Sequence, residues 1–445
     1  MTHARSVLIG TAAALVAGLV AVSPADAAVN INVGCSVGAL KAAIVAANGG
    51  GGGTLALAPG CTYTLTTVDN TGSAGPNGLP VLSSPITVVG NSATIERSAN
   101  LGTPEFRVLE VAASAALRAD TLTIRNGFLP GGKGGGIYNG TGAQSTLTRV
   151  TMTGNLTTTI FHPVFSIGFG SAIYNHAGRV LLESVSMTGN GDVTGEGGGV
   201  ANSAGEVEVR NSTFRNNQAD SGGALINTGV NSTTVVRNSL FVGNRGVDAG
   251  GALDNDFMNT MSVTGSTFAD NAGASGAAIF NGAFGAHGIT IADSSFTGNA
   301  GVQGGGLFNF GTAVVTNSRF TTGSALEGGA IRNTHELTLT GAVLSANSGN
   351  LGGGLNNAAG ATANVSNTVI NANIAPLYLG SQHGLGGGVF NEGTLVLTAS
   401  VVMNNTAAVS GGGVQNGGQV VLQGGSAVVA NSPDNCVNTG SGTGC

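Results

Sequence analysis

The sequence has no tryptophan, only 4% aromatic residues and only 8% charged residues. A soluble domain ordinarily carries about 25% charged residues, so an ordinary globular α/β domain is disfavoured. The 15 basic residues are scattered along the chain, and the net charge is -6. Because the basic stripe of a nucleic-acid-binding protein is missing, we expect no DNA or RNA partner.

Glycine, in contrast, is abundant, with 78 residues among 445. High glycine content can indicate collagen or disorder. Here, however, valine, leucine, isoleucine and alanine recur throughout, and the mean hydropathy is +0.27. The chain therefore has the apolar surface that a folded core requires.

A glycine-rich motif that ends in asparagine recurs eleven times, first as Gly-Gly-Gly-Ile-Tyr-Asn over residues 134–139. Most intervals between copies span 24 to 28 residues. A repeat of this period indicates a solenoid. The motif asparagines are Asn139, Asn175, Asn202, Asn227, Asn255, Asn281, Asn309, Asn333, Asn357, Asn391 and Asn416.

Between the motif asparagines, apolar and polar residues alternate, as in residues 207–217. Alternation with a period of two predicts short β-strands, and no part of the repeat is long enough to favour a helical solenoid. Apolar pairs five residues apart, such as Val209 with Phe214 and Val263 with Phe268, are expected to stack into inner rows. The sequence therefore predicts an all-β, single-stranded right-handed parallel β-helix of roughly fourteen coils, about 65 Å long.

Asparagine and glycine have a structural explanation in such a rod. Asparagine tolerates the left-handed backbone conformation of sharp corners, and stacked amides can bond from coil to coil. Paired glycines allow positive φ and close backbone approach. We expect both residue types to build the corners.

Four regions follow along the chain. Residues 1–27 are predicted to be an export signal, with an apolar run over 7–22 and a small-x-small site at 25–27. Residues 28–133 form the N-terminal cap and first coils, with a short capping helix at 37–48. Residues 134–431 carry the β-helix repeats, and 432–445 form a C-terminal cap. No later segment has the 18 apolar residues of a membrane span, so we expect a secreted, extracellular or cell-surface protein.

The four cysteines predict two disulfides in an exported protein. We expect Cys35 to pair with Cys61 and Cys436 with Cys445, which would staple the two ends of the rod. The two other pairings remain open.

The repeats also resemble a known family. Gly-Gly-Ala-Leu occurs at 222–225 and 250–253, and Gly-Gly-Ala-Ile at 328–331. Phe214, Phe241, Phe268 and Phe296 are each followed three residues later by asparagine. Over about residues 134–431 these motifs resemble the repeats of chlamydial polymorphic outer membrane proteins, which implies a surface adhesin. The chain departs from that family by ending at Cys445 without a membrane barrel.

More broadly, the chain resembles pectin-lyase-like proteins, whose β-helix also carries an amino-terminal cap and asparagine ladders. That resemblance implies a lyase or hydrolase of acidic polysaccharides. The sequence lacks Asp-Asp, Gly-His-Gly and Arg-x-Lys, so the polygalacturonase pattern is not matched. No His-Glu-x-x-His or Gly-x-Ser-x-Gly motif occurs either, and no catalytic residue is assigned.

Four acids are candidate calcium ligands. Asp220 and Asp248 each precede a motif asparagine by seven residues, which predicts adjacent coils at one corner. Asp254 and Asp256 flank Asn255. Carboxylates about 5 Å apart repel unless a cation lies between them, so calcium is the one cofactor considered. The alternative is that these acids are merely solvated.

Two arginines and two loops are candidate ligand-binding groups. Arg210 and Arg237 occupy the same repeat position, and could bind an anionic polysaccharide or be neutralised by Glu208. The long intervals 155–175 and 373–391 predict loops, which solenoids often use for binding. Their candidate residues are Phe161, His162, Tyr378 and His383. The alternative is local packing against the rod.

Two functions remain open at this point. The first is a secreted surface or matrix protein that presents loops for adhesion or for binding a glycan or cell-surface protein. The second is an extracellular polysaccharide lyase or glycoside hydrolase. The two functions predict different positions for the acidic side chains. An enzyme needs its acidic residues in one groove, whereas a binding rod does not.

Overall fold

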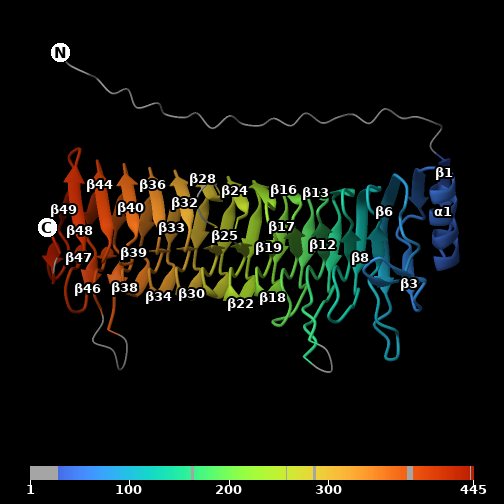
Figure 1. Ribbon diagram of the computed structural model, residues 1–445, viewed down its shortest axis with the longest axis horizontal. Coiled ribbons are helices and arrows are strands. Elements are labelled where there is room, and N and C mark those ends of the chain that lie inside the picture. Colours follow the sequence, from blue (N-terminus) through green and yellow to red (C-terminus); the bar gives the residue numbers. More distant parts are fainter. Residues whose placement is uncertain are drawn as a thin grey trace, which may run out of the picture.

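The computed structural model describes residues 29–161, 165–256, 258–283, 287–377, 384–440 and 442–444. These residues form a parallel β-solenoid of about 14 turns, which confirms the predicted β-helix (Figure 1). The predicted export signal lies outside the described residues. No helix in the described part of the chain is long and apolar enough to cross a membrane.

Each regular coil contributes four short strands. One coil runs through β16 (Glu206–Arg210), β17 (Thr213–Arg215), β18 (Gln218–Ser221) and β19 (Leu225–Thr228). The first two belong to a 27-stranded sheet, the third to an 8-stranded sheet and the fourth to a 13-stranded sheet. In Figure 1, β16 lies along the upper side of the rod, and β18 and β22 (Arg245–Ala249) lie along the lower side.

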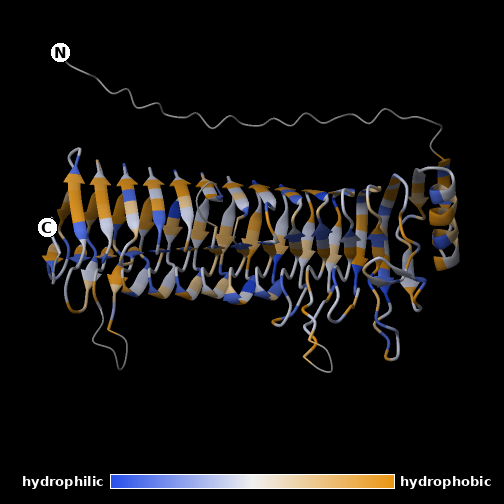
Figure 2. Ribbon diagram, in the orientation of Figure 1, coloured by the Kyte–Doolittle hydropathy of each residue, from blue (hydrophilic) through white to orange (hydrophobic). Residues whose placement is uncertain are grey.

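Strands of successive coils pair in parallel and in register. β17 pairs with β21 (Leu240–Val242), so that Phe214 lies over Phe241. The same register stacks five buried phenylalanine rings with neighbouring centroids 4.4, 4.8 or 4.9 Å apart. The predicted inner apolar row is therefore confirmed, and it is formed by Phe214, Phe241, Phe268, Phe296 and Phe320. Figure 2 shows hydrophobic residues running through the strands of the rod.

The motif asparagines form a continuous inner ladder. Asn202 Nδ2 donates to Asn227 Oδ1 at 2.9 Å, and Asn227 Nδ2 donates to Asn255 Oδ1 at 3.1 Å. The same bond links all eleven motif asparagines, from Asn139 to Asn416. Because every one of these side chains is buried, the ladder supplies the hydrogen bonds that burial of an amide requires. The predicted coil-to-coil amide bonding is confirmed.

Helix α1 (Val37–Gly49) covers the amino-terminal end of the rod, as predicted for residues 37–48. The Ser36 side chain caps it by accepting a hydrogen bond from the Ala39 backbone N–H. One apolar face, including Leu40 and Ile44, is buried against the first coils. A strand that the sequence analysis did not predict, β1 (Val29–Val33), precedes the helix and pairs in parallel with β2 (Gly53–Leu57).

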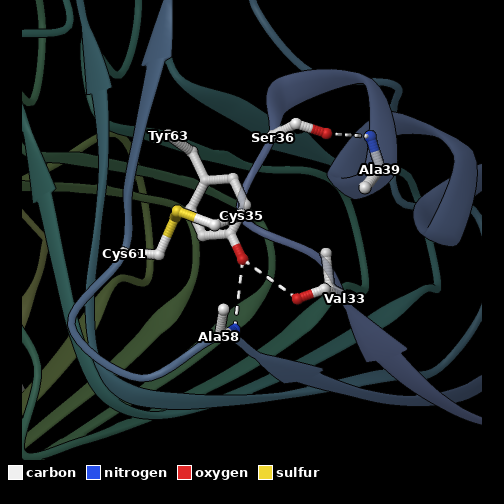
Figure 3. The surroundings of a disulfide bond; sticks show 7 residues. All are labelled: Val33, Cys35, Ser36, Ala39, Ala58, Cys61 and Tyr63. Carbon is white, nitrogen blue, oxygen red and sulfur yellow. Dashed lines mark hydrogen bonds between the residues drawn. A yellow bond between two sulfur atoms is a disulfide. The ribbon is translucent and has the colours of Figure 1, made fainter.

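A disulfide joins Cys35 to Cys61 beside this cap, which confirms the first predicted pairing (Figure 3). The Tyr63 hydroxyl lies next to it, accepts from the Ala58 N–H at 3.2 Å and donates to the Val33 carbonyl at 3.4 Å. Cys436 is also disulfide-bonded. Its predicted partner, Cys445, lies outside the described residues, so that pairing stays a prediction.

Candidate functional site

The outer side of the 13-stranded sheet carries an unusual residue in β23 (Leu253–Asn255). Side chains alternate along a strand, so Leu253 and Asn255 enter the core and Asp254 points out. Asp254 is nevertheless only 2% exposed, and its Oδ1 atom has no hydrogen-bond partner. A buried carboxyl oxygen without a hydrogen-bond partner is energetically costly, and therefore marks this place as a functional candidate.

Four further carboxyl groups lie within electrostatic reach of Asp254 or of one another. Asp254 interacts with Asp256, Asp248 and Glu196. Glu196 in turn interacts with Asp256 and Asp220, and Asp220 with Asp248. We call these five residues the acid cluster. It brings together all four acids predicted from the sequence and adds Glu196.

The acid cluster shifts the pKa values of several of its members upward. Burial, followed by the charges of Asp256 and Asp220, raises the pKa of Glu196 to about 7. Burial, followed by neighbouring carboxylates, raises the pKa of Asp254 well above its ordinary value. Burial also raises the pKa values of Asp220 and Asp256. Desolvation and like charge both disfavour the ionised form, so at least one member is partly protonated near neutral pH.

None of the ion pairs among the described residues includes a member of the acid cluster. The causes of the pKa shifts are burial and carboxylates, with no basic side chain among them. In contrast, the buried Glu110 bonds Arg107 at 3.1 Å, and Ser73 and Asn77 also donate to it. The chain thus satisfies a buried acid at one place and leaves several unpaired at another.

A cleft with a volume of about 210 Å³ opens beside the acid cluster. Glu196 and Asp220 form its acidic side, while Phe161 and Phe165 contribute aromatic rings. The centroids of these two rings lie 6.0 Å apart, and Phe161 is 69% and Phe165 62% exposed. Thr159, Ile167, Val193 and Thr194 complete the lining.

The aromatic wall belongs to the first of the two predicted loops. Ile160 and Ser166 exchange backbone hydrogen bonds as an antiparallel bridge. The Thr159 N–H donates to Thr194 Oγ1 at 3.0 Å, and Ser166 Oγ donates to the Gly131 carbonyl at 2.8 Å. These bonds hold the loop against two neighbouring turns of the rod.

The cleft lies where the 8-stranded sheet begins. Its edge strand is β18, which contains Asp220 and pairs only with β22 within that sheet. Glu196 continues the same line as an isolated bridge to Ser221. In Figure 1 the lower row of strands starts at β18, and longer loops hang below the coils that precede it.

Two other predictions have different outcomes. Arg210 and Arg237 face each other across β16 and β20 (Thr233–Arg237) as expected, and both contact Glu208, at 2.6 and 3.8 Å. They lie on the 27-stranded sheet and not with the acid cluster. His162, Tyr378 and His383 fall outside the described residues.

Calcium binding stays a prediction. Across the described ranges, no three His, Cys, Asp or Glu side chains are grouped so that they could hold a metal ion. The acid cluster is therefore close enough for charges to interact without forming a ready set of metal ligands.

Glu196 is the site residue that the sequence interpretation missed, although a signal for it exists. It precedes Asn202 by six residues, and Ser221, its bridge partner, precedes Asn227 by six. The counting that brought Asp220 and Asp248 together would therefore have placed Glu196 one coil away from Asp220.

Comparisons with known proteins add little to this geometry. No protein-family model matches the sequence, so the resemblance to chlamydial repeats stays unconfirmed. No curated protein matches it either. Among solved structures, the chain is similar to PfbA, a surface adhesin of Streptococcus pneumoniae, with 14% identity and a TM-score of 0.37, over 87% of this chain and 86% of that one.

A second similar structure is the A-module of the mannuronan C-5 epimerase AlgE6 from Azotobacter vinelandii. It has 11% identity and a TM-score of 0.25, over 91% of this chain and 95% of that one. Both similarities are too low to transfer an activity to this chain.

Proposed function

We propose that this protein is an extracellular β-helical protein that binds a polysaccharide in the cleft beside the acid cluster. The observation that supports this is the combination of two exposed rings, Phe161 and Phe165, with two carboxyl groups, Glu196 and Asp220, around one cavity. Apolar ring faces pack against sugar rings, and a few placed polar groups fix orientation. The disulfide between Cys35 and Cys61 supports an oxidising, extracellular location.

The test is affinity for a panel of acidic, neutral and cationic polysaccharides, measured by calorimetry on the full mature chain. Phe161→Ala and Phe165→Ala should each weaken the binding of any ligand found by about tenfold, because each removes a contact worth roughly 1–2 kcal/mol. Phe310→Ala is the matched control, since Phe310 is 43% exposed on a later coil. Failure of the whole panel to bind, or binding that ignores both cleft variants, would contradict the proposal.

A second candidate function is hydrolysis of the bound glycan. It is favoured by one observation, the pKa of about 7 at Glu196 beside other carboxyls. A protonated carboxylic acid can protonate the leaving oxygen of a glycosidic bond, while an ionised neighbour activates water or attacks the sugar. Glu196 and Asp220 line one cleft, and a pair of carboxyl groups in one groove supports this second candidate.

The test of this second candidate is the appearance of new reducing ends in any glycan that binds. Measured at saturating glycan, Glu196→Gln should lower the hydrolysis rate at least about a hundredfold, the range expected on loss of a general acid. Unchanged reducing ends with every bound glycan would leave binding as the function and reject hydrolysis.

A further inference from the structure

We propose that the cleft selects an amine-bearing, cationic glycan over an acidic one. The proposal rests on the proposed binding function and names the substrate class of the same site. It is carried by charge, by an unsatisfied buried carboxyl and by the shape of the cleft.

Charge is the first argument. Glu196 and Asp220 line the cleft, and each of the other three members of the acid cluster interacts electrostatically with one of these two residues. An acidic polysaccharide would bring further carboxylates toward these groups, which like-charge repulsion penalises. A protonated amine would instead supply the positive charge that no described side chain supplies there.

The unsatisfied carboxyl is the second argument, independent of how many acids surround it. Asp254 is 2% exposed, and its Oδ1 accepts no hydrogen bond. The chain is able to complete such a group, because the equally buried Glu110 receives bonds from Arg107, Asn77 and Ser73. Asp254 does not line the cleft, but it interacts electrostatically with Glu196, so a cation bound at Glu196 would also offset the uncompensated charge of Asp254.

Among the described residues, the nearby basic side chains form no ion pair with the acid cluster, and this includes Arg245, which begins the same strand as Asp248. Lys133 Nζ lies 5.1 Å from the centre of the Tyr174 ring, and Arg107 lies over Tyr138 at 5.2 Å while bonding Glu110. The acid cluster therefore stays free to receive a ligand cation.

The cleft's shape is the third argument. A volume of about 210 Å³ is below the roughly 300–1,000 Å³ of typical small-molecule pockets, so one sugar ring with its substituent fits and the polymer runs across the opening. Phe161 and Phe165 offer ring faces to the sugar and attract a cation within about 6 Å. An amine on the bound sugar ring would then point toward Glu196 and Asp220.

The experiment is calorimetry on the full mature chain, in EDTA, with three hexasaccharides. These are a glucosamine hexamer, its N-acetylated counterpart, which has the same length without the charge, and a galacturonic acid hexamer. The glucosamine hexamer should bind about tenfold or more tightly than the N-acetylated one, and added salt should erode that advantage. The galacturonic acid hexamer should bind most weakly.

Charge-removing variants then locate the effect. Glu196→Gln and Asp220→Asn should each lower glucosamine affinity about five- to tenfold and change N-acetylated affinity less than twofold. Glu336→Gln is the control, because it makes the same charge change at an exposed residue of β36 (Glu336–Thr340) in the 27-stranded sheet. It should leave both affinities unchanged.

Several results would overturn the proposal. They are equal binding of the cationic and neutral hexamers, preference for galacturonic acid, or an amine preference that survives Glu196→Gln and Asp220→Asn. Any of these with intact cleft binding leaves the proposed function standing. No binding of these or any other glycan removes both.

Discussion

Asn255 and Asp254 are neighbours on one short strand. The contrast between them distinguishes the residues that stabilise the β-helix from those of the candidate site. Both side chains are buried. Asn255 faces the core, accepts from Asn227 Nδ2 and donates to Asn281 Oδ1 at 2.9 Å. Asp254 faces the other way and has an oxygen with no partner.

The two faces of the 13-stranded sheet differ in whether the same residue type recurs from coil to coil. Inside the rod, each coil supplies the hydrogen-bond partner of the next, so the same residue recurs at every level. On the outer side of the same sheet the corresponding residues differ from coil to coil, with Tyr174, Ala201, Ile226 and Asp254 in sequence. Repetition is therefore the mark of the scaffold, and departure from it marks the candidate site.

The largest expected effect comes from breaking an inner row. Phe268→Ala removes a fully buried ring that stacks at 4.9 and 4.8 Å on its two neighbours. We expect a loss of about 3–5 kcal/mol in the free energy of unfolding, because a buried cavity replaces the ring. Urea denaturation measures it, and Phe161→Ala, on the exposed cleft wall, should change stability by less than about 0.5 kcal/mol. Equal losses of unfolding free energy in the two variants would contradict the distinction between the buried inner row and the exposed cleft wall.

A somewhat smaller loss is expected from interrupting the ladder. Asn255→Leu removes one of the two acceptors of Asn227 Nδ2, which keeps its bond to the Thr260 carbonyl, and leaves Asn281 Oδ1 without its donor in the core. Unsatisfied buried groups cost about 1–3 kcal/mol each, so we expect a loss of about 2–4 kcal/mol by urea denaturation. A loss below about 1 kcal/mol would show that the ladder does not hold the coils together.

The smallest effect belongs to the outer face and depends on pH. Asp254 has a raised pKa, so the folded state holds its proton at a pH where the unfolded state, near its ordinary value of 3.8, releases it. Folding stability therefore falls as pH rises above that value, and the loss is complete once the folded-state pKa is passed. Asp256, Glu196 and Asp248 are the charged groups that strengthen this effect.

Asp254→Asn should remove that pH dependence while preserving the size of the side chain. At neutral pH the variant should be more stable than the parent, because its amide has no charge for burial and the neighbouring carboxylates to disfavour. Melting curves across the acidic to neutral range check it. A variant whose stability follows the same pH profile as the parent would contradict the assignment.

Much of the fold could be predicted because the sequence repeat determines the length and the stacking of the coils. The spacing of the motif asparagines indicated the coils, and the ladder from Asn139 to Asn416 follows from stacking them. The residues between Val37 and Asn48 indicated the capping helix. Strand β1 was missed because its five residues precede the repeat and carry no period.

The candidate site could be predicted only in part. Counting from the motif placed Asp220 beside Asp248, since both belong to regular coils. It did not indicate that Asp254 is buried, because that burial depends on packing around the outer side of the sheet and not on strand alternation. It also did not join Phe161 to Glu196, since the path of an inserted loop is set by bonds such as that between Thr159 and Thr194.

The central claim is that the acid cluster is an unpaired, partly protonated site, and the pKa of Glu196 tests it most directly. Carboxyl ¹³C signals of selectively labelled glutamates can be followed by NMR through a pH titration, with Glu196→Gln identifying the signal of interest. We predict one glutamate that titrates at about pH 7 and moves downward when Asp220 or Asp256 is replaced by asparagine. A Glu196 signal that titrates near 4.5 would contradict the account, because it would mean that the carboxyl is solvated or already paired.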